Sequence, residues 1–267
     1  MDNPVLRKEL MRYRLKVAKP VKLATVLVVI LIFLLLYIEI GLSLHNSSNQ
    51  GSDASDLCNL LLWLQFLGVL IFAPGIMCSS IAQEREQQTL DMLLYSPLKT
   101  EEIVFGKITA RIIAVSFLLL LIAPLILICA LIAMNRGSLH LFNVMNAYLT
   151  TFITVFFALA ISLFYSWRLK RTLYALIATY STVIGLLIIA DSMVSVALSI
   201  IAGSGNGSSP LLWINPVMLF NQALSPDLAH PQSAIFQLLG LAFYLVCSFI
   251  LIWTVIRGLK RNRTNTA

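Results

Sequence analysis

Long uninterrupted runs of apolar residues, separated by short polar segments, dominate the chain. Several of these runs exceed the roughly 18 residues that mark a membrane-spanning helix. The runs are continuous rather than alternating, which excludes a transmembrane β-barrel. The pattern predicts an all-α integral membrane protein. Its six transmembrane helices are expected at about 21–44, 57–82, 108–134, 146–167, 173–202 and 234–256.

The composition supports a multi-pass membrane protein. Only 12% of the residues are charged, whereas a soluble domain is nearer a quarter charged. The net charge of +7 could indicate a nucleic-acid partner. The basic residues, however, stand at the ends of the predicted spans, where membrane topology places them. We therefore expect membrane lipids, and no nucleic acid, as partners.

The distribution of basic residues predicts the orientation. All but one of the 19 Lys and Arg residues fall on one side of the six predicted spans, and Arg136 stands alone on the other. By the positive-inside rule, both termini are cytoplasmic. The chain is expected to form a single transmembrane domain over 1–267. Its expected parts are an interfacial helix at 1–20, a six-span bundle at 21–256 and a basic cytoplasmic tail at 257–267.

The first segment has an amphipathic pattern. Apolar and basic residues alternate at helical spacing, with Leu6, Leu10, Tyr13 and Val17 among Arg7, Lys8, Arg12 and Arg14. This pattern favours a helix on an anionic membrane surface, although a simple positive-inside flank would also explain the basic residues. The apolar run that follows is too long for a signal peptide, so we expect an uncleaved first span.

The longest polar island is 83–107, which we call the elbow. Helical spacing separates a polar face (Glu84, Gln87, Gln88, Asp91) from an apolar face (Leu90, Leu93, Leu94). Glu84 and Glu86 are expected to face water. Pro97 cannot continue a helix, so the first helix of the elbow should end near Tyr95 or Ser96. Thr100 is a plausible N-cap for the next helix, with Glu101 and Glu102 in its first turn.

The external segment 203–232 is too apolar for a free loop and too short to span the membrane. Pro210 and Pro216 interrupt its apolar residues. It predicts a pair of short interfacial or re-entrant helices buried in protein. The alternative is an ordinary loop that carries an aromatic belt residue.

No catalytic constellation is recognisable. The chain has no P-loop, no H-E-x-x-H and no G-x-S-x-G. We therefore expect neither an enzyme nor a nucleotide site in this chain, and no cofactor or metal bound by it. Its four cysteines lie in or beside apolar runs and are interpreted as small buried hydrophobes. Glu39 and Asp191 are the acids within predicted spans: they could line a substrate path, or merely reach headgroups and an external vestibule.

The elbow resembles the signature of ABC-2-type permeases, the membrane subunits of ATP-driven exporters. Its matching elements are Glu84-Arg85-Glu86, Thr89-Leu90-Asp91, Leu93-Leu94, Pro97-Leu98, Glu102-Ile103 and Gly106-Lys107. Gln88 stands where that pattern has a glycine, which should favour a continuous helix. Asn3-Pro4-Val5-Leu6 and Asn215-Pro216 are also similar to that family.

The resemblance implies a mode of assembly. The elbow would be a coupling helix that contacts a separate cytosolic ABC ATPase subunit, which would carry ATP and Mg. The implied contact residues are Glu84, Arg85, Glu86, Gln88, Thr89, Leu90, Asp91 and Leu94. The N-terminal helix, with Arg7, Lys8, Arg12 and Arg14, would be a connecting helix against the same partner. A second permease copy, identical or related, would complete the substrate path in a bacterial cytoplasmic membrane.

Two other functional classes compete with this interpretation. A self-sufficient channel or secondary transporter would favour charged mid-membrane lining and internal repeats of spans. Asp191 alone approaches such a lining, and no repeat is recognisable in the sequence. A membrane enzyme would need a motif that the sequence lacks. The interpretation favoured by the sequence is a permease subunit of an ATP-driven exporter.

Overall fold

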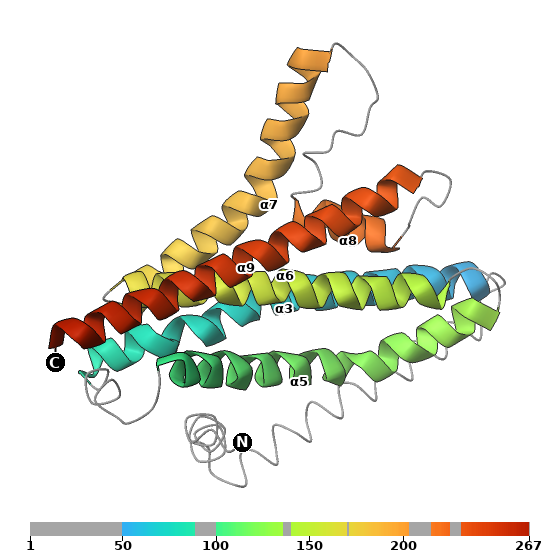
Figure 1. Ribbon diagram of the computed structural model, residues 1–267. Helices are drawn as coiled ribbons and strands as arrows, with labels where there is room; N and C mark the ends of the chain where they lie inside the picture. Colours follow the sequence, from blue (N-terminus) through green and yellow to red (C-terminus); the bar gives the residue numbers. More distant parts are fainter. Residues whose placement is uncertain are drawn as a thin grey trace, which may run out of the picture. The chain divides into compact units, whose positions relative to one another are not determined.

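The computed structural model describes residues 50–88, 100–135, 140–169, 171–202, 215–224 and 231–266. Within these ranges the chain is helical and contains no strand (Figure 1). The helices are α3 (Gln50–Glu86), α5 (Thr100–Asn135), α6 (Leu141–Arg168), α7 (Thr172–Ala202), α8 (Pro216–Leu224) and α9 (Pro231–Thr266). The predicted all-α class is confirmed for this part of the chain.

Four of the described helices are long and apolar enough to cross a membrane: α3, α5, α6 and α9. They correspond to the second, third, fourth and sixth predicted spans. The fifth predicted span matches the bounds of α7, whose described apolar stretch is the shorter Thr172–Leu187. The first predicted span, 21–44, lies outside the described residues. The count of six and the orientation of the termini stay predictions.

The described residues group into two compact units. One unit takes its residues from Met1–Gln65 and Phe105–Leu141, and the other from Phe66–Val104 and Phe142–Ala267. In the first unit, buried Gln65 donates its side-chain amide to the Leu119 carbonyl at 3.3 Å. This bond links α3 to α5 by the kind of interhelical polar contact that membrane helices use.

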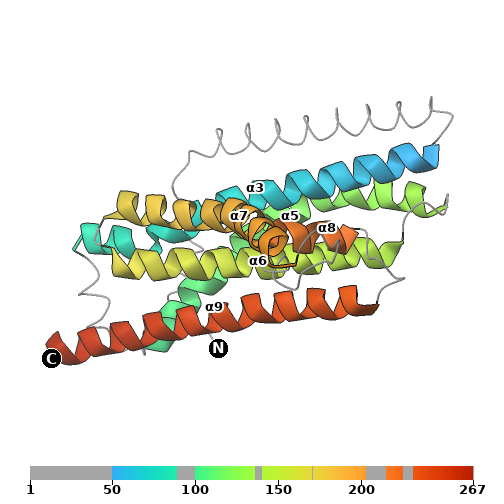
Figure 2. The same ribbon diagram turned by 90° about the horizontal axis from the view of Figure 1, so that it is seen from above.

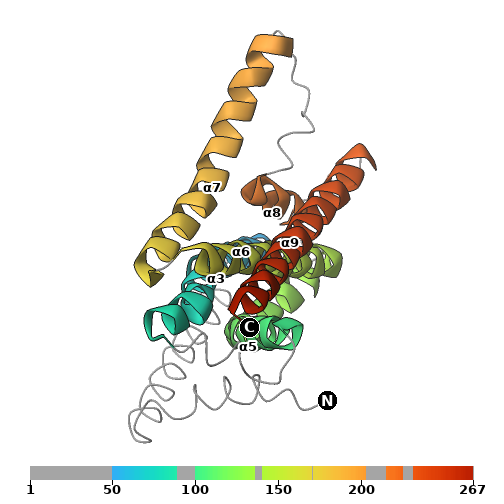
Figure 3. The same ribbon diagram turned by 60° about the vertical axis from the view of Figure 1, so that its left-hand side comes forward.

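The second unit is built around α6, whose buried residues run along most of its length. Figure 2 shows α6 between the neighbouring helices of this unit. Figures 1 and 3 show that α7 starts beside the end of α6 and then inclines away from it. Ile153, Leu219, Leu241 and Tyr244 form a buried apolar cluster that joins α6, α8 and α9.

The short helix α8 is fixed at both ends. The side-chain oxygen of Asn215 accepts a bond from the Val217 backbone amide at 2.9 Å. The side-chain nitrogen of Asn215 donates to the Leu187 carbonyl at 3.2 Å. At the other end, Asn143 donates to the Leu224 carbonyl at 3.1 Å. An Asn cap followed by Pro at the first helical position is a strong start signal.

The position of α8 agrees with part of the prediction for 203–232. One short helix is present there, and Leu219, Phe220 and Ala223 are fully buried in protein. The Phe220 ring stacks on Phe66 with centroids 4.3 Å apart. The expected second short helix would lie outside the described residues.

The helix α3 continues through Pro74, which lies within the predicted second span. A proline removes one backbone donor and leaves nearby carbonyl groups in need of partners. Side chains of two neighbouring helices supply donors: the Tyr180 hydroxyl bonds the Ile71 carbonyl at 2.6 Å, and the Ser162 hydroxyl bonds the Pro74 carbonyl at 2.8 Å. The apolar part of α3 is therefore tied to α6 and α7.

Candidate functional site

The structure describes part of the predicted site. Glu84, Arg85 and Glu86 form the last turn of α3, and Gln88 follows in a turn. The remaining predicted residues of the coupling helix (Thr89, Leu90, Asp91, Leu94), those of the connecting helix (Arg7, Lys8, Arg12, Arg14) and the acid Glu39 lie outside the described residues. Asp191 lies in α7, and its side chain is also outside the described part.

Glu86 makes a bidentate contact with the start of α7. One carboxylate oxygen accepts a bond from the Thr172 amide at 2.7 Å, and the other accepts one from the Thr172 hydroxyl at 2.8 Å. The first amides of a helix lack partners within the helix, and the helix dipole favours an anion there. Glu86, which comes from the end of another helix, thus caps α7.

The bond changes the acidity of Glu86, which lies beyond the apolar run of α3 that ends at Ala82. The amide and hydroxyl of Thr172 both stabilise the carboxylate and lower the pKa of Glu86, and the nearby charge of Arg171 acts in the same direction. The Glu86 side chain is exposed to solvent, as the sequence predicts. The contact is therefore charged at neutral pH and open to water.

One turn before Glu86, Ser166 of α6 bonds backbone groups of α3. Its hydroxyl donates to the Cys78 carbonyl at 2.7 Å and accepts from the Ala82 amide at 2.9 Å. These are the two groups that would bond each other in an uninterrupted α-helix. The same oxygen also accepts from the Ile81 amide at 3.1 Å. A side chain inserted in this way is a recognised cause of helix bending.

The start of α7 packs against the interrupted turn. Cys78, Ala82 and Ala175 form a small buried cluster, and the Cys78 thiol lies 3.7 Å from the Thr172 carbonyl. We call the residues that meet here, Cys78–Glu86 of α3, Ser162–Arg168 of α6 and Thr172–Thr179 of α7, the elbow corner. Three helices share this corner, and most of the bonds between them involve backbone groups.

Two predictions about the elbow need correction. The first is the exposure of Glu84, which was expected to face water. Glu84 is only partly exposed, and one of its carboxylate oxygens is fully buried. A charge reversal at Glu84 would therefore disturb the packing of the last turn of α3 as well as its surface charge.

The second correction concerns the expected continuous helix. α3 ends at Glu86, and Gln88 has a φ of 55°. The predicted helix end near Tyr95 or Ser96 lies outside the described residues. That angle lies in the left-handed region, which an α-helix cannot use. The family pattern has a glycine at this position, and glycine adopts such an angle without a steric penalty. The substitution by Gln therefore does not extend the helix.

The second half of the elbow begins as predicted. α5 starts at Thr100, and Glu101 and Glu102 lie in its first turn. Glu101 pairs with Lys260 of α9 at 2.6 Å. Both side chains are about half exposed, so the pair contributes at most a small stabilisation. It nevertheless connects the elbow to the basic end of α9.

A close approach between α6 and α9 lies beside the elbow corner. A Cβ atom built on Gly258 would stand 2.1 Å from the Trp167 ring. Only glycine permits this approach, because any side chain would overlap the indole. Trp167 directly follows Ser166, so the position of α9 and the interruption of α3 depend on neighbouring residues of α6.

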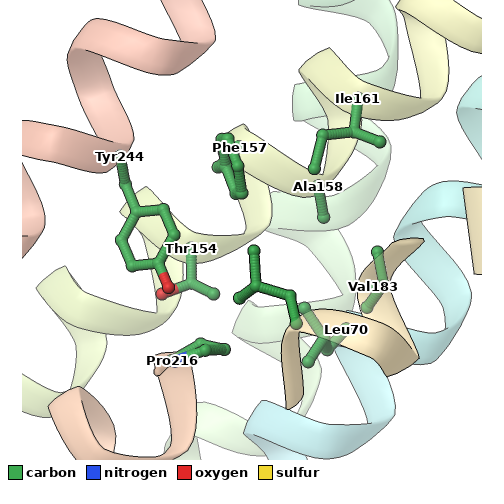
Figure 4. Close-up of a pocket in the computed structure, with 9 residues that line it drawn as sticks. Leu70, Thr154, Phe157, Ala158, Ile161, Val183, Pro216 and Tyr244 are labelled. Atoms are coloured by element: carbon green, nitrogen blue, oxygen red, sulfur yellow. The ribbon is translucent and has the colours of Figure 1, made fainter. Parts of the chain in front are cut away.

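The second unit contains a small apolar cavity, shown in Figure 4. Its lining comes from α3, α6, α7, α8 and α9 and includes Leu70, Thr154, Val183, Pro216 and Tyr244. The space open to the centre of a water-sized sphere is about 20 Å³, which is room for little more than one small molecule. The cavity is too small to be a cargo site in this conformation.

The two serines that bond α3 were not predicted from the sequence. Ser162 and Ser166 are four residues apart in an otherwise apolar stretch of α6. That spacing places both hydroxyls on one face of a helix, which could have indicated a partner with unsatisfied backbone groups. Pro74 in the second predicted span supplied the matching signal. The Glu86–Thr172 bond had no comparable signature.

The comparisons with known proteins are consistent with the architecture. The sequence model of the ABC-2 family transporter proteins matches residues 5–257, which is nearly the whole chain. No curated protein matches the sequence closely enough to serve as a relative. Because the family match covers all the described helices except the last residues of α9, the chain belongs to the ABC-2 family of transporter proteins.

Proposed function

We propose that this chain is the transmembrane permease subunit of an ABC exporter, which couples ATP hydrolysis on a separate subunit to transport across the membrane. The match to the ABC-2 family over 5–257 is the observation that carries the proposal. The partner would be a cytosolic ATPase subunit that binds ATP and Mg. A second permease copy, identical or related, would complete the path in a bacterial cytoplasmic membrane.

The elbow is the proposed contact with the ATPase subunit. It leaves α3 and enters α5, so a displacement of the elbow acts on two long apolar helices. Gln87 and Gln88 are exposed at its start, and Glu101 and Glu102 are exposed at the start of α5. A polar segment joined directly to candidate spans suits the transfer of motion from a soluble partner.

Co-purification tests the proposal. The tagged chain is extracted gently from its native membrane, and the soluble proteins that remain bound are identified by mass spectrometry. We expect a stoichiometric subunit with a P-loop. A chain that purifies alone, and that moves solute into vesicles without ATP, would instead indicate a channel or a gradient-driven carrier.

A pair of leucine variants locates the contact. Leu90→Asp introduces a charge on the predicted apolar face of the elbow and should release the ATPase subunit. Leu141→Asp is the matched control, because Leu141 is 45% exposed at the start of α6 and an acid is favourable in the first turn of a helix. Retention of the subunit by the Leu90 variant would exclude that face as the contact.

A further inference from the structure

The bonds of Glu86 suggest a role different from a contact with the ATPase subunit. Both carboxylate oxygens are already engaged by Thr172, at 2.7 and 2.8 Å. Charge-assisted bonds of this length are among the stronger polar contacts in proteins. The carboxylate is thus directed at α7 of the same chain, even though it is exposed.

The turn that carries Glu86 follows a point where a side chain of another helix enters the backbone bonding of α3. The Ser166 hydroxyl bonds both the Ala82 amide and the Cys78 carbonyl, so we infer that it weakens their direct bond. A helix is stiff because each turn is bonded to the next, so an inserted hydroxyl makes bending at this turn easier. A displacement of the elbow is therefore passed less rigidly along α3 than through an intact helix.

The interruption leaves α7 as the element joined most directly to the end of α3. Thr172 donates hydrogen bonds to the Glu86 carboxylate, and Ala175 packs on Cys78 and Ala82. α7 then inclines away from α6 (Figure 3). A small rotation at its first turn consequently produces a larger displacement at its far end.

We propose that Glu86 is a positioning residue that passes movement of the elbow to α7 through Thr172, while the Ser166 insertion lets the last turn of α3 pivot. This inference rests on the proposed function, because the movement would be started by an ATPase subunit. It assigns Glu86 to transmission within the chain, whereas the family resemblance places it among the residues that contact the partner.

The test uses hydrogen exchange on the complex of the chain with its ATPase subunit in lipid nanodiscs. Exchange is measured by mass spectrometry in 83–88 and 172–178, with and without Mg²⁺ and the non-hydrolysable ATP analogue AMP-PNP. In the wild type, we expect the analogue to change exchange in both segments. In Glu86→Gln, which weakens the acceptor, the response should persist in 83–88 and be lost in 172–178.

Three variants serve as controls. Thr172→Val removes the hydroxyl and should weaken the response of 172–178, whereas Thr172→Ser keeps both donors and should retain it. Glu101→Gln removes another exposed carboxylate of the elbow, one that bonds Lys260 rather than α7, and should also retain it. Without the partner, Glu86→Gln should raise exchange in the first turn of α7.

The outcomes separate the inference from the proposed function. A full response of 172–178 in Glu86→Gln, or no response there in the wild type, would overturn the transmission role. Loss of the ATPase subunit in Glu86→Gln but not in Thr172→Val would make Glu86 a partner contact and also overturn it. A wild-type chain that binds no ATPase subunit would refute the proposed function, and the inference would fail with it.

Discussion

The elbow corner and the α8 corner lie in the same unit and use the same chemistry. We define the α8 corner as α8 with its two clamps, Asn143 and Asn215. In both places, polar side chains bond backbone groups of another helix. At the α8 corner these bonds satisfy the two ends of a short helix. At the elbow corner, the Ser166 hydroxyl bonds an amide and a carbonyl that lie inside a long helix, near its end.

The difference shows that one type of bond can have opposite mechanical effects. A helix end has free amides and carbonyls, so a side chain that bonds them completes the structure. Inside a helix each amide is already bonded to a backbone carbonyl, so a side-chain oxygen that accepts from such an amide competes with the backbone bond. We therefore expect the α8 corner to be rigid and the elbow corner to bend. The following variants test that contrast.

The largest effect is expected for Gly258→Ala, which should disrupt the elbow corner and leave the α8 corner intact. The added Cβ would stand 2.1 Å from the Trp167 ring, so the ring or α9 must move. Overpacking of this kind costs about 1–3 kcal/mol. The free energy of unfolding, measured by SDS titration in mixed micelles, should fall by that order.

Gly68→Ala is the matched control for this variant. A Cβ on Gly68 would meet nothing within 4 Å, so the same change in a helix should stabilise the protein by up to about 1 kcal/mol. Equal effects at Gly68 and Gly258 would contradict the close approach of α6 and α9.

The next effect is expected for Ser166→Ala, which removes the hydroxyl from the ladder of α3. The Cys78 carbonyl and the Ala82 amide can then bond each other, but the Ile81 amide loses a partner. We expect a loss of about 1 kcal/mol together with slower hydrogen exchange of Ala82. Ser248→Ala is the control, since that buried hydroxyl bonds the Tyr244 carbonyl of its own helix. Faster exchange of Ala82 would show that the insertion does not weaken the helix.

At the α8 corner, Asn215→Ala should loosen a small helix without affecting the elbow corner. It removes the cap on Val217 and the bond to Leu187, and the loss of a cap costs about 1 kcal/mol. Exchange in 216–224 should rise while exchange in 172–178 is unchanged. Asn215→Asp keeps the accepting oxygen and should show a smaller rise. An equal rise in both segments would contradict the independence of the two corners.

The sequence predicted the elements that depend on local or compositional signals. Thr100 before two glutamates marks a helix start that the structure places there. Of the six spans that the apolar runs predicted, four correspond to described helices long and apolar enough to cross a membrane. Such signals are readable because the residues involved are neighbours in the chain.

The sequence did not predict contacts between residues that are far apart in the chain. Glu86 and Thr172 are 86 residues apart, and each alone has the pattern of an ordinary solvated residue. The partial burial of Glu84 depends in the same way on the packing around it. The break at Gln88 was not predicted because a Gln side chain favours a helix, whereas the backbone angle at this position is that of a turn.

The smallest effect, and a direct test of that turn, is expected for Gln88→Gly. A φ of 55° costs a residue with a side chain roughly 1 kcal/mol, which glycine avoids at the expense of a more flexible unfolded chain. The net stabilisation should be about 0.5 kcal/mol. Gln87→Gly is the control, because Gln87 is an exposed neighbour with the same side chain and gains nothing from glycine. If Gln88→Gly destabilises the chain as much as Gln87→Gly, Gln88 does not hold a left-handed backbone angle in the folded protein. The elbow would then continue α3 as a helix, and the elbow corner would lose its sharp end at Glu86.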